Sequence, residues 1–260
     1  MYQTISVEHD ARGVAVLRLA RPDKHNALSS QMIEELTGAA QALASDTRVR
    51  VVVLTGTGKS FCAGGDLRWM QAQMWADDAE RAAEARKLAM MLKALNELPK
   101  PLIGKIQGQA FGGGIGMMSV CDVAIGVEGA RFGLTETRLG LIPATIGPYV
   151  VARMGEAMAR RVFMSARIFD AGEAVRLGLL ARAVPAAALD AAVEAEVAPY
   201  LACAPGAVAE AKALLRMLGP VISDSRIDET IAALVERWKS EEAGEGLTAF
   251  FDRRPPRWAE

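Results

Sequence analysis

Residues 102–127 read LIGKIQGQAFGGGIGMMSVCDVAIGV and decide the fold class. The apolar runs at 102–106 and 122–127 predict two strands, and the glycine-rich segment between them opens a short helix that reaches about Val120. Short apolar runs without alternation are typical of strands that are buried on both faces of a sheet. This stretch therefore predicts an α/β protein.

The flanking sequence extends this pattern on both sides. Residues 4–9 and 14–19 predict a β-hairpin, and residues 51–54 predict another strand buried on both faces. Ser29 or Ser30 is placed to cap a helix over about residues 32–44. Further helices are predicted at 67–75, 78–98, 187–202, 207–218 and 227–242, with a short β-like piece at 179–184. The last ~65 residues thus read as an all-α appendage to a mixed core.

Composition narrows the class of protein. The chain has 260 residues, is 51% hydrophobic and 23% charged, and carries a net charge of −1, which is typical of a globular protein and disfavours a polyanion-coating protein or a disordered tail. The first residues lack an apolar signal-peptide region and no apolar stretch is long enough to span a bilayer, so no membrane association is expected. Three cysteines without a C-x-x-C pair indicate a reducing, cytoplasmic setting.

The small number of histidines limits the kinds of metal and catalytic site that the chain can form. With only His9 and His25, a histidine-rich metal site or a histidine-centred triad has almost no place to form, so no metal site is expected and acid–base chemistry must depend on carboxylates or the backbone.

Two segments resemble nucleotide-binding motifs but lack features that those motifs require. Residues 53–60 differ from a phosphate-binding P-loop because Val53 stands where glycine is required and no helix begins at Lys59. The glycines at 112–116 lack the G-x-G-x-x-G spacing, and too few residues separate them from the next strand for a crossover helix.

The glycine clusters have another physical reading. Residues 61–66 and 112–114 each follow a strand and precede a helix, so the backbone there can approach a ligand closely and the first amides of the helix are unpaired. Two such N–H donors that converge on one point would make an oxyanion hole. Either cluster by itself is equally compatible with a tight strand-to-helix turn.

Taken in order, these segments resemble the crotonase, or enoyl-CoA hydratase/isomerase, superfamily. The matches fall across about residues 12–190: Arg21-Pro-Asp-Lys-His-Asn-Ala-Leu28, Val52-Val-Leu-Thr-Gly56, Phe61-Cys-Ala-Gly-Gly-Asp-Leu67, Pro99-Lys-Pro101, Gly108-x-Ala-x-Gly-Gly-Gly114, Cys121-Asp122 and Glu136-Thr-Arg-Leu-Gly140. The ending Phe250-Phe-Asp-Arg-Arg-Pro-Pro-Arg257 is also similar to the family's C-terminus.

The resemblance implies a fold and a set of partners. It implies a spiral of ββα units over residues 1–195 that carries the active site, and a C-terminal helical trimerisation region over 196–260. The substrate would be an acyl-CoA thioester, with no cofactor beyond the CoA that belongs to it. The assembly would be a homotrimer or a dimer of trimers, and no nucleic-acid or membrane partner is expected.

The same resemblance implies roles for individual residues. The backbone N–H groups of Ala63 and Gly113 would hold the thioester oxygen, and Glu136 would be the acid–base carboxylate. The remaining substrate-binding residues implied are Lys24, His25, Ala27, Cys62, Gly64, Gly65, Asp66, Leu67, Gly112 and Arg138.

One departure bears on the mechanism. Two-glutamate hydratases of the family carry their first glutamate two residues after the glycine triplet, where this chain has Gly116. A single carboxylate suits two reactions, namely hydration of an enoyl-CoA and migration of its double bond. The segment from Gly112 to Tyr149 looks most like bacterial methylglutaconyl-CoA or carboxygeranoyl-CoA hydratases, which serve leucine or isoprenoid-acid breakdown.

The sequence leaves several alternatives open. Hydration is the leading interpretation; a double-bond isomerase is the nearest alternative, and a non-catalytic acyl-CoA-binding or RNA-associated relative is the alternative from another class, although the near-neutral charge argues against RNA. Arg138 either faces a second carboxylate on the acyl group or makes a structural ion pair. Asp122 is expected to be a structural residue that organises its turn.

Overall fold

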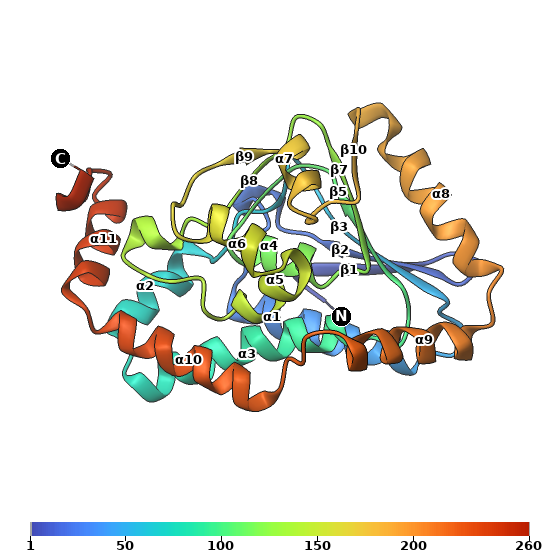
Figure 1. Cartoon of the computed structure of the whole chain (residues 1–260), viewed down its shortest axis with the longest axis horizontal. Coiled ribbons are helices and arrows are strands. Elements are labelled where there is room, and N and C mark those ends of the chain that lie inside the picture. Colours follow the sequence, from blue (N-terminus) through green and yellow to red (C-terminus); the bar gives the residue numbers. More distant parts are fainter. Residues whose placement is uncertain (1, 260) are drawn as a thin grey trace.

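The computed structural model describes residues 2–259 and contains two sheets wrapped by helices (Figure 1). The larger sheet has the order β1-β2-β3-β5-β7-β10, in which β1 and β2 pair antiparallel and the other neighbours pair parallel. Its strands are β1 (Ile5–His9), β2 (Val14–Leu19), β3 (Val51–Gly56), β5 (Leu102–Ile106), β7 (Val123–Val127) and β10 (Arg182–Val184).

The smaller sheet has the order β4-β6-β8-β9. Its strands are β4 (Ser60–Cys62), β6 (Gln109–Phe111), β8 (Arg131–Gly133) and β9 (Phe169–Asp170). Three consecutive strand pairs, β3–β4, β5–β6 and β7–β8, each place their first strand in the larger sheet and their second in the smaller one, and each pair is followed by helix. This repeated step is the predicted spiral of ββα units, which the structure confirms.

Helices cover the sheets and form the C-terminal part of the chain. The α-helices are α1 (Ser30–Ser45), α2 (Leu67–Trp75), α3 (Asp78–Asn96), α4 (Gly113–Ser119), α5 (Gly147–Met154), α6 (Glu156–Phe163), α7 (Ala171–Arg176), α8 (Leu189–Leu201), α9 (Pro205–Leu218), α10 (Asp224–Trp238) and α11 (Glu241–Phe251). Single 3-10 turns are η1 (Pro22–Lys24), η2 (Glu136–Leu139), η3 (Ala186–Ala188) and η4 (Arg257–Ala259). Between residues 2 and 259, no helix combines the length and the apolar character that crossing a bilayer requires.

The strands of the larger sheet form for the reason that the sequence suggested. Every residue of β3 is buried, as expected for a strand covered on both faces, and β5 and β7 are almost as apolar and buried. Ser29 caps α1 by accepting a hydrogen bond from the Met32 N–H, as predicted. The main core joins the larger sheet to buried residues of the helices that cover it, including α1, α3, α4, α5, α7 and α8.

Two predictions about elements were wrong or incomplete. The helix predicted over residues 227–242 is two helices, because Ser240 accepts a hydrogen bond from the Ala243 N–H and starts a new helix after the break at Lys239. The smaller sheet was not predicted at all. Its strands have two or three residues each, which is too short to show any periodicity in the sequence.

Candidate active site

A cavity of about 480 Å³ lies where the two glycine-rich segments meet η2 and α2. Most of its wall is apolar, and among the residues that the structure describes Glu136 is the one carboxylate in the lining. The helices α10 and α11 close one side with Leu234, Trp238 and Phe250. One acidic group therefore lies in a largely apolar cavity.

The two glycine segments come close to each other beside this carboxylate. Gly64 and Gly112 both have positive φ, +92° and +47°, which side chains rarely tolerate. A Cβ atom on Gly112 would lie 3.9 Å from the Gly64 Cα and 3.1 Å from Oε1 of Glu136. Glycine at position 112 therefore keeps open the space next to Glu136, and glycine at position 64 lets the two segments approach each other there.

The two predicted N–H donors differ in their surroundings. Gly113 is the first residue of α4, so its N–H has no acceptor within the helix. The N–H of Ala63 donates to the carbonyl oxygen of His25 at 3.0 Å. Both residues line the cavity, but of the two only the Gly113 N–H has no acceptor among residues 2–259.

Glu136 itself is half-buried, and its Oε2 atom is shielded from water with no hydrogen-bond partner among residues 2–259. Burial disfavours the charged form and raises the pKa of Glu136 to about 7, against the smaller, opposing effect of a bond from its own backbone N–H. A carboxyl group that titrates near neutral pH can both accept and donate a proton. This group is therefore suited to acid–base catalysis.

The C-terminal helices fix the segment that carries Glu136. Gly140 ends η2 with φ +69°, and its backbone packs so tightly against α11 that an added Cβ would lie 2.3 Å from the Glu242 carbonyl oxygen. Arg237 of α10 donates to the Gly140 carbonyl oxygen at 2.6 Å. The last part of the chain, which sequence reasoning set apart from the active site, thus supports and lines it.

The predicted substrate-binding residues divide into two groups. Those that line the cavity together with Ala63, Gly113 and Glu136 are Gly64, Gly65, Leu67, Gly112 and Arg138. Those that lie outside its lining are Lys24, His25, Ala27, Cys62 and Asp66.

The residues outside the lining have structural contacts. His25 Nδ1 is 2.9 Å from the Ser60 hydroxyl, and Ala27 and Cys62 are buried. Asp66 caps α2 by accepting from the Arg68 N–H and forms an ion pair with Arg21 at 2.8 Å. Lys24 is exposed in η1.

Several lining residues were missed by sequence reasoning. They are apolar and come from separate elements: Ile33, Leu88, Leu141, Ile142, Ile146, Leu234, Trp238 and Phe250. An apolar residue on a helix gives no sign of whether it faces the core or a cavity, so no local signal identifies this group.

Fold and site together define an acid–base enzyme in which one buried carboxyl group faces a glycine-lined backbone. Comparisons with known proteins specify it further. The family described as Enoyl-CoA hydratase/isomerase matches residues 9–260. The chain therefore belongs to the enoyl-CoA hydratase/isomerase family and has its crotonase fold.

Individual relatives cover nearly the whole chain. It is 32% identical over 265 residues to the mitochondrial methylglutaconyl-CoA hydratase of Mus musculus, which covers 97% of this chain and 81% of that protein. The crystal structure of an enoyl-CoA hydratase from Mycobacterium avium superposes with a TM-score of 0.89 at 31% identity, covering 99% of this chain and 100% of the other. An enoyl-CoA hydratase from Shewanella pealeana gives a TM-score of 0.81 at 38% identity, with 98% and 96% covered.

Proposed function

We propose that this enzyme adds water across the 2,3 double bond of an enoyl-CoA thioester. The proposal rests on the position of Glu136. Its buried carboxyl group has a pKa near 7 and lies beside two glycine segments, which have no side chains. The enoyl-CoA hydratases to which the chain is similar make this reaction class the first one to test.

The proposed reaction proceeds through an enolate. Ionised Glu136 orients a water molecule and takes its proton while the oxygen attacks the β-carbon. The negative charge that develops on the thioester oxygen is stabilised by the N–H groups of Gly113 and Ala63. Protonated Glu136 then returns the proton to the α-carbon. The Ala63 donor must share or exchange its bond to the His25 carbonyl oxygen for this purpose.

Binding of the CoA portion is assigned by resemblance to the sequence around Lys24 and to residues 63–67. Coenzyme A enters as part of the substrate, so the proposed reaction uses no separate cofactor. Gly64, Gly65 and Leu67 supply cavity wall where the pantetheine arm would pass.

A branched or carboxylated acyl group is the proposed substrate class. Arg138 lines the cavity, is exposed, and forms no ion pair with any carboxylate of residues 2–259. The lack of such an ion pair supports the interpretation in which the guanidinium of Arg138 pairs with a distal carboxylate of the substrate. A methylglutaconyl-CoA-like substrate would place the enzyme in leucine or isoprenoid-acid breakdown.

A double-bond isomerase is the second candidate function. The cavity holds one carboxylate among the described residues, and moving a proton between two carbons needs one such group and no water.

One experiment separates the two candidate reactions. The protein, a Glu136→Gln variant and a Glu128→Gln control are incubated with a panel of enoyl-CoA thioesters in ¹⁸O-labelled water, and the products are analysed by mass spectrometry. Glu128 is exposed and lies outside the cavity lining. Gain of labelled water that is lost only in Glu136→Gln supports the hydratase. A shifted double bond at unchanged mass supports the isomerase. Binding without any conversion overturns both candidate reactions for the substrates in the panel.

The proposed trimer, or dimer of trimers, draws on the exposed side of α9 and the residues just after it. Apolar side chains there are 50–73% exposed: Leu214, Leu215, Met217, Leu218 and Val221. Such a patch marks an interaction surface more often than open surface. Light scattering should give a mass of three or six chains of 27.7 kDa, and Leu215→Glu with Leu218→Glu should reduce it. A monomeric parent protein would overturn this part of the proposal.

A further inference from the structure

Helix α2 forms one wall of the cavity but is weakly anchored in the core. Leu67, Trp69 and Met70 of this helix line the cavity, whereas its one buried residue is Gln73. Met70 and Met74 make partial apolar contact with the small cluster around Leu247. A helix that buries so little apolar surface must be positioned largely by polar contacts.

The first of these contacts fixes Trp69. Its indole Nε1 donates to Oε2 of Glu84, on α3, at 2.8 Å. On its other side the ring lies against the backbone of Gly65, where an added Cβ would be 3.4 Å from Cε3 of Trp69. Trp69 is thus held between α3 and the glycine segment that borders the reaction centre.

Glu84 is itself fixed from three directions. Its Oε2 also accepts from the Ser30 hydroxyl of α1 at 2.6 Å, and its Oε1 accepts from Lys87 at 2.8 Å. These hydrogen bonds stabilise the ionised carboxylate and hold its pKa below the ordinary value in spite of burial. The carboxylate is therefore a charged, oriented acceptor for the indole N–H.

The second contact fixes the other end of α2. Arg81 of α3 donates to the carbonyl oxygens of Gln73 at 3.0 Å and Met74 at 3.2 Å, which are among the unpaired carbonyls of the helix C-terminus. The same guanidinium lies 5.4 Å from the ring centre of Trp238, another lining residue. Both anchors of α2 therefore come from α3.

We infer that Glu84 is a positioning residue that sets acyl-chain selectivity by holding Trp69 as a fixed wall of the cavity. Trp69 and Glu136 line the same cavity of about 480 Å³, so a fixed indole sets the space that is left for the acyl group beside the reacting carboxyl group. Releasing the indole lets α2 move outward and admits longer chains. This inference rests on the proposed acyl-CoA substrate, but not on which reaction follows binding.

The test compares binding of butanoyl-CoA and decanoyl-CoA, which are saturated and unreactive, by calorimetry. The variants are Glu84→Ala, Glu84→Gln, Trp69→Phe and the double variant Glu84→Ala/Trp69→Phe. Lys87→Ala is the matched control, because it removes a charge partner of Glu84 and leaves the bond to Trp69 in place. In parallel, kcat and KM are measured with crotonyl-CoA and 2-decenoyl-CoA.

The wild-type protein should bind butanoyl-CoA more tightly than decanoyl-CoA. Glu84→Ala and Trp69→Phe should each reduce this preference about tenfold, the size expected for loss of one charge-assisted hydrogen bond. The double variant should lose no more than either single variant, since both remove the same bond. Glu84→Gln should keep most of the preference through its amide oxygen, and Lys87→Ala should keep it fully.

The kcat for crotonyl-CoA should stay within about twofold in Glu84→Ala, with the change confined to KM for the longer substrate.

Unchanged selectivity in folded Glu84→Ala, or effects of the two single variants that multiply in the double variant, would overturn the inference. Absence of turnover by the wild-type protein overturns the proposed reaction instead, while the calorimetric comparison still tests the role of Glu84.

Discussion

Ile146 occupies the space that any side chain on Gly116 would need. A Cβ atom on Gly116 would lie 2.7 Å from Cγ2 of Ile146 and 3.3 Å from Cδ1 of Leu92. Gly116 is buried in α4, and Ile146 precedes α5 and lines the cavity. The position at which two-glutamate relatives carry their first carboxylate is therefore filled by an apolar side chain from another segment.

This packing predicts opposite effects for two glycine substitutions in helices. Gly116→Ala should destabilise the protein by about 1 kcal/mol or more, because overpacking outweighs the gain in helix propensity. Gly38→Ala should stabilise it by about 0.5–1 kcal/mol, since nothing lies within 4 Å of an added Cβ on this exposed position of α1. Urea unfolding measures both. Adding Ile146→Ala should lessen the cost of Gly116→Ala; strictly additive effects would show that the two residues do not compete for space.

The raised pKa of Glu136 predicts a pH-dependent rate. The carboxylate must be ionised to take a proton from water, and its pKa is about 7, so kcat/KM should rise with pH and level off above an inflection near 7. Stopped assays with crotonyl-CoA between pH 5 and 9 check this. Glu136→Gln should reduce kcat by several hundredfold or more at pH 8–9, where the wild-type carboxylate is ionised, and by less as the pH falls below 7. A profile that is flat from pH 5 to 9 would assign the base to another group.

The same group predicts an unusual stability profile. A glutamate that titrates at 4.5 when unfolded and at about 7 when folded binds more protons in the folded state between these values, so stability falls as pH rises through this window. Relative to the wild-type protein, Glu136→Gln should gain about 3 kcal/mol at pH 8 and nearly nothing at pH 4.5. Chemical unfolding at the two pH values gives the difference. An equal difference at both pH values would contradict a raised pKa of Glu136 in the folded protein.

Much of the larger sheet could be predicted because its signals are local. The apolar runs that became β3, β5 and β7 are continuous in sequence, and Ser29 caps the helix that it precedes. The smaller sheet could not be predicted in this way. Strands such as β4 and β9 exist because neighbouring turns of the spiral bring them together, and that pairing is a property of the whole fold.

The candidate active site could likewise be predicted only in part. The glycine clusters beside Glu136 could be selected from their order and spacing, but the burial that raises the pKa of this carboxyl group arises only in the folded chain, where residues of α10 and α11 complete the cavity lining. Neither the close approach of Ile146 to Gly116 nor the bond of Trp69 to Glu84 leaves a pattern in the sequence, because each joins residues of separate elements.

Arg138 predicts selectivity for a carboxylated acyl group. If its guanidinium pairs with a distal carboxylate, Arg138→Ala should raise KM for methylglutaconyl-CoA about 10- to 100-fold and leave KM for crotonyl-CoA nearly unchanged. Arg138→Lys should recover part of the loss, since lysine keeps the charge but not the planar fork. Arg131→Ala is the control, because Arg131 is exposed on β8 and lies outside the cavity lining. Equal losses with both substrates would make Arg138 a general structural residue.

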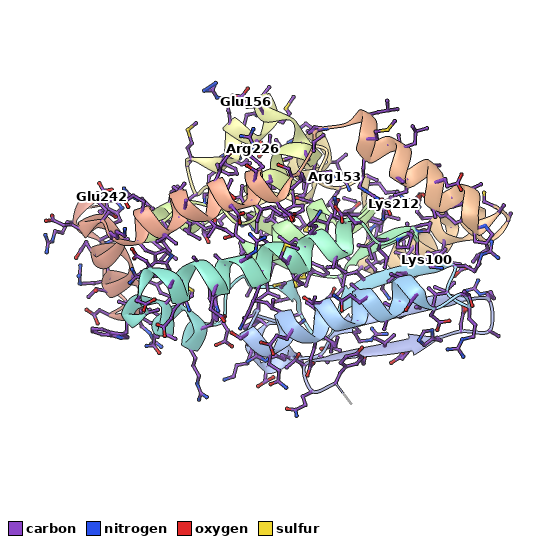
Figure 2. All side chains as sticks on the ribbon, turned by 90° about the horizontal axis from the view of Figure 1, so that it is seen from below. Lys100, Arg153, Glu156, Lys212, Arg226 and Glu242 are labelled. Atoms are coloured by element: carbon purple, nitrogen blue, oxygen red, sulfur yellow. The ribbon has the colours of Figure 1, made fainter. Side chains whose placement is uncertain are left out.

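Lys212 and Asp122 predict a loss of stability that leaves catalysis intact. Lys212 of α9 donates to Oδ2 of Asp122 at 2.7 Å and to the Lys100 carbonyl oxygen at 3.0 Å, and Asp122 also accepts from the Leu102 N–H. Burial lowers the pKa of Lys212, whose side chain is 10% exposed. Figure 2 shows Lys100 and Lys212 in one region of the molecule, and neither lines the cavity.

Lys212→Met should therefore destabilise the protein by about 2–3 kcal/mol in urea unfolding, because it leaves the Asp122 carboxylate and the Lys100 carbonyl without this partner. Lys239→Met is the matched control; its ion pairs with Asp78 and Glu236 are exposed, so it should cost less than about 1 kcal/mol. With crotonyl-CoA, kcat and KM of folded Lys212→Met should equal those of the wild-type protein. A fall in kcat at unchanged stability would instead make Asp122 part of the catalytic machinery, against its interpretation as a residue that organises the turn before β7.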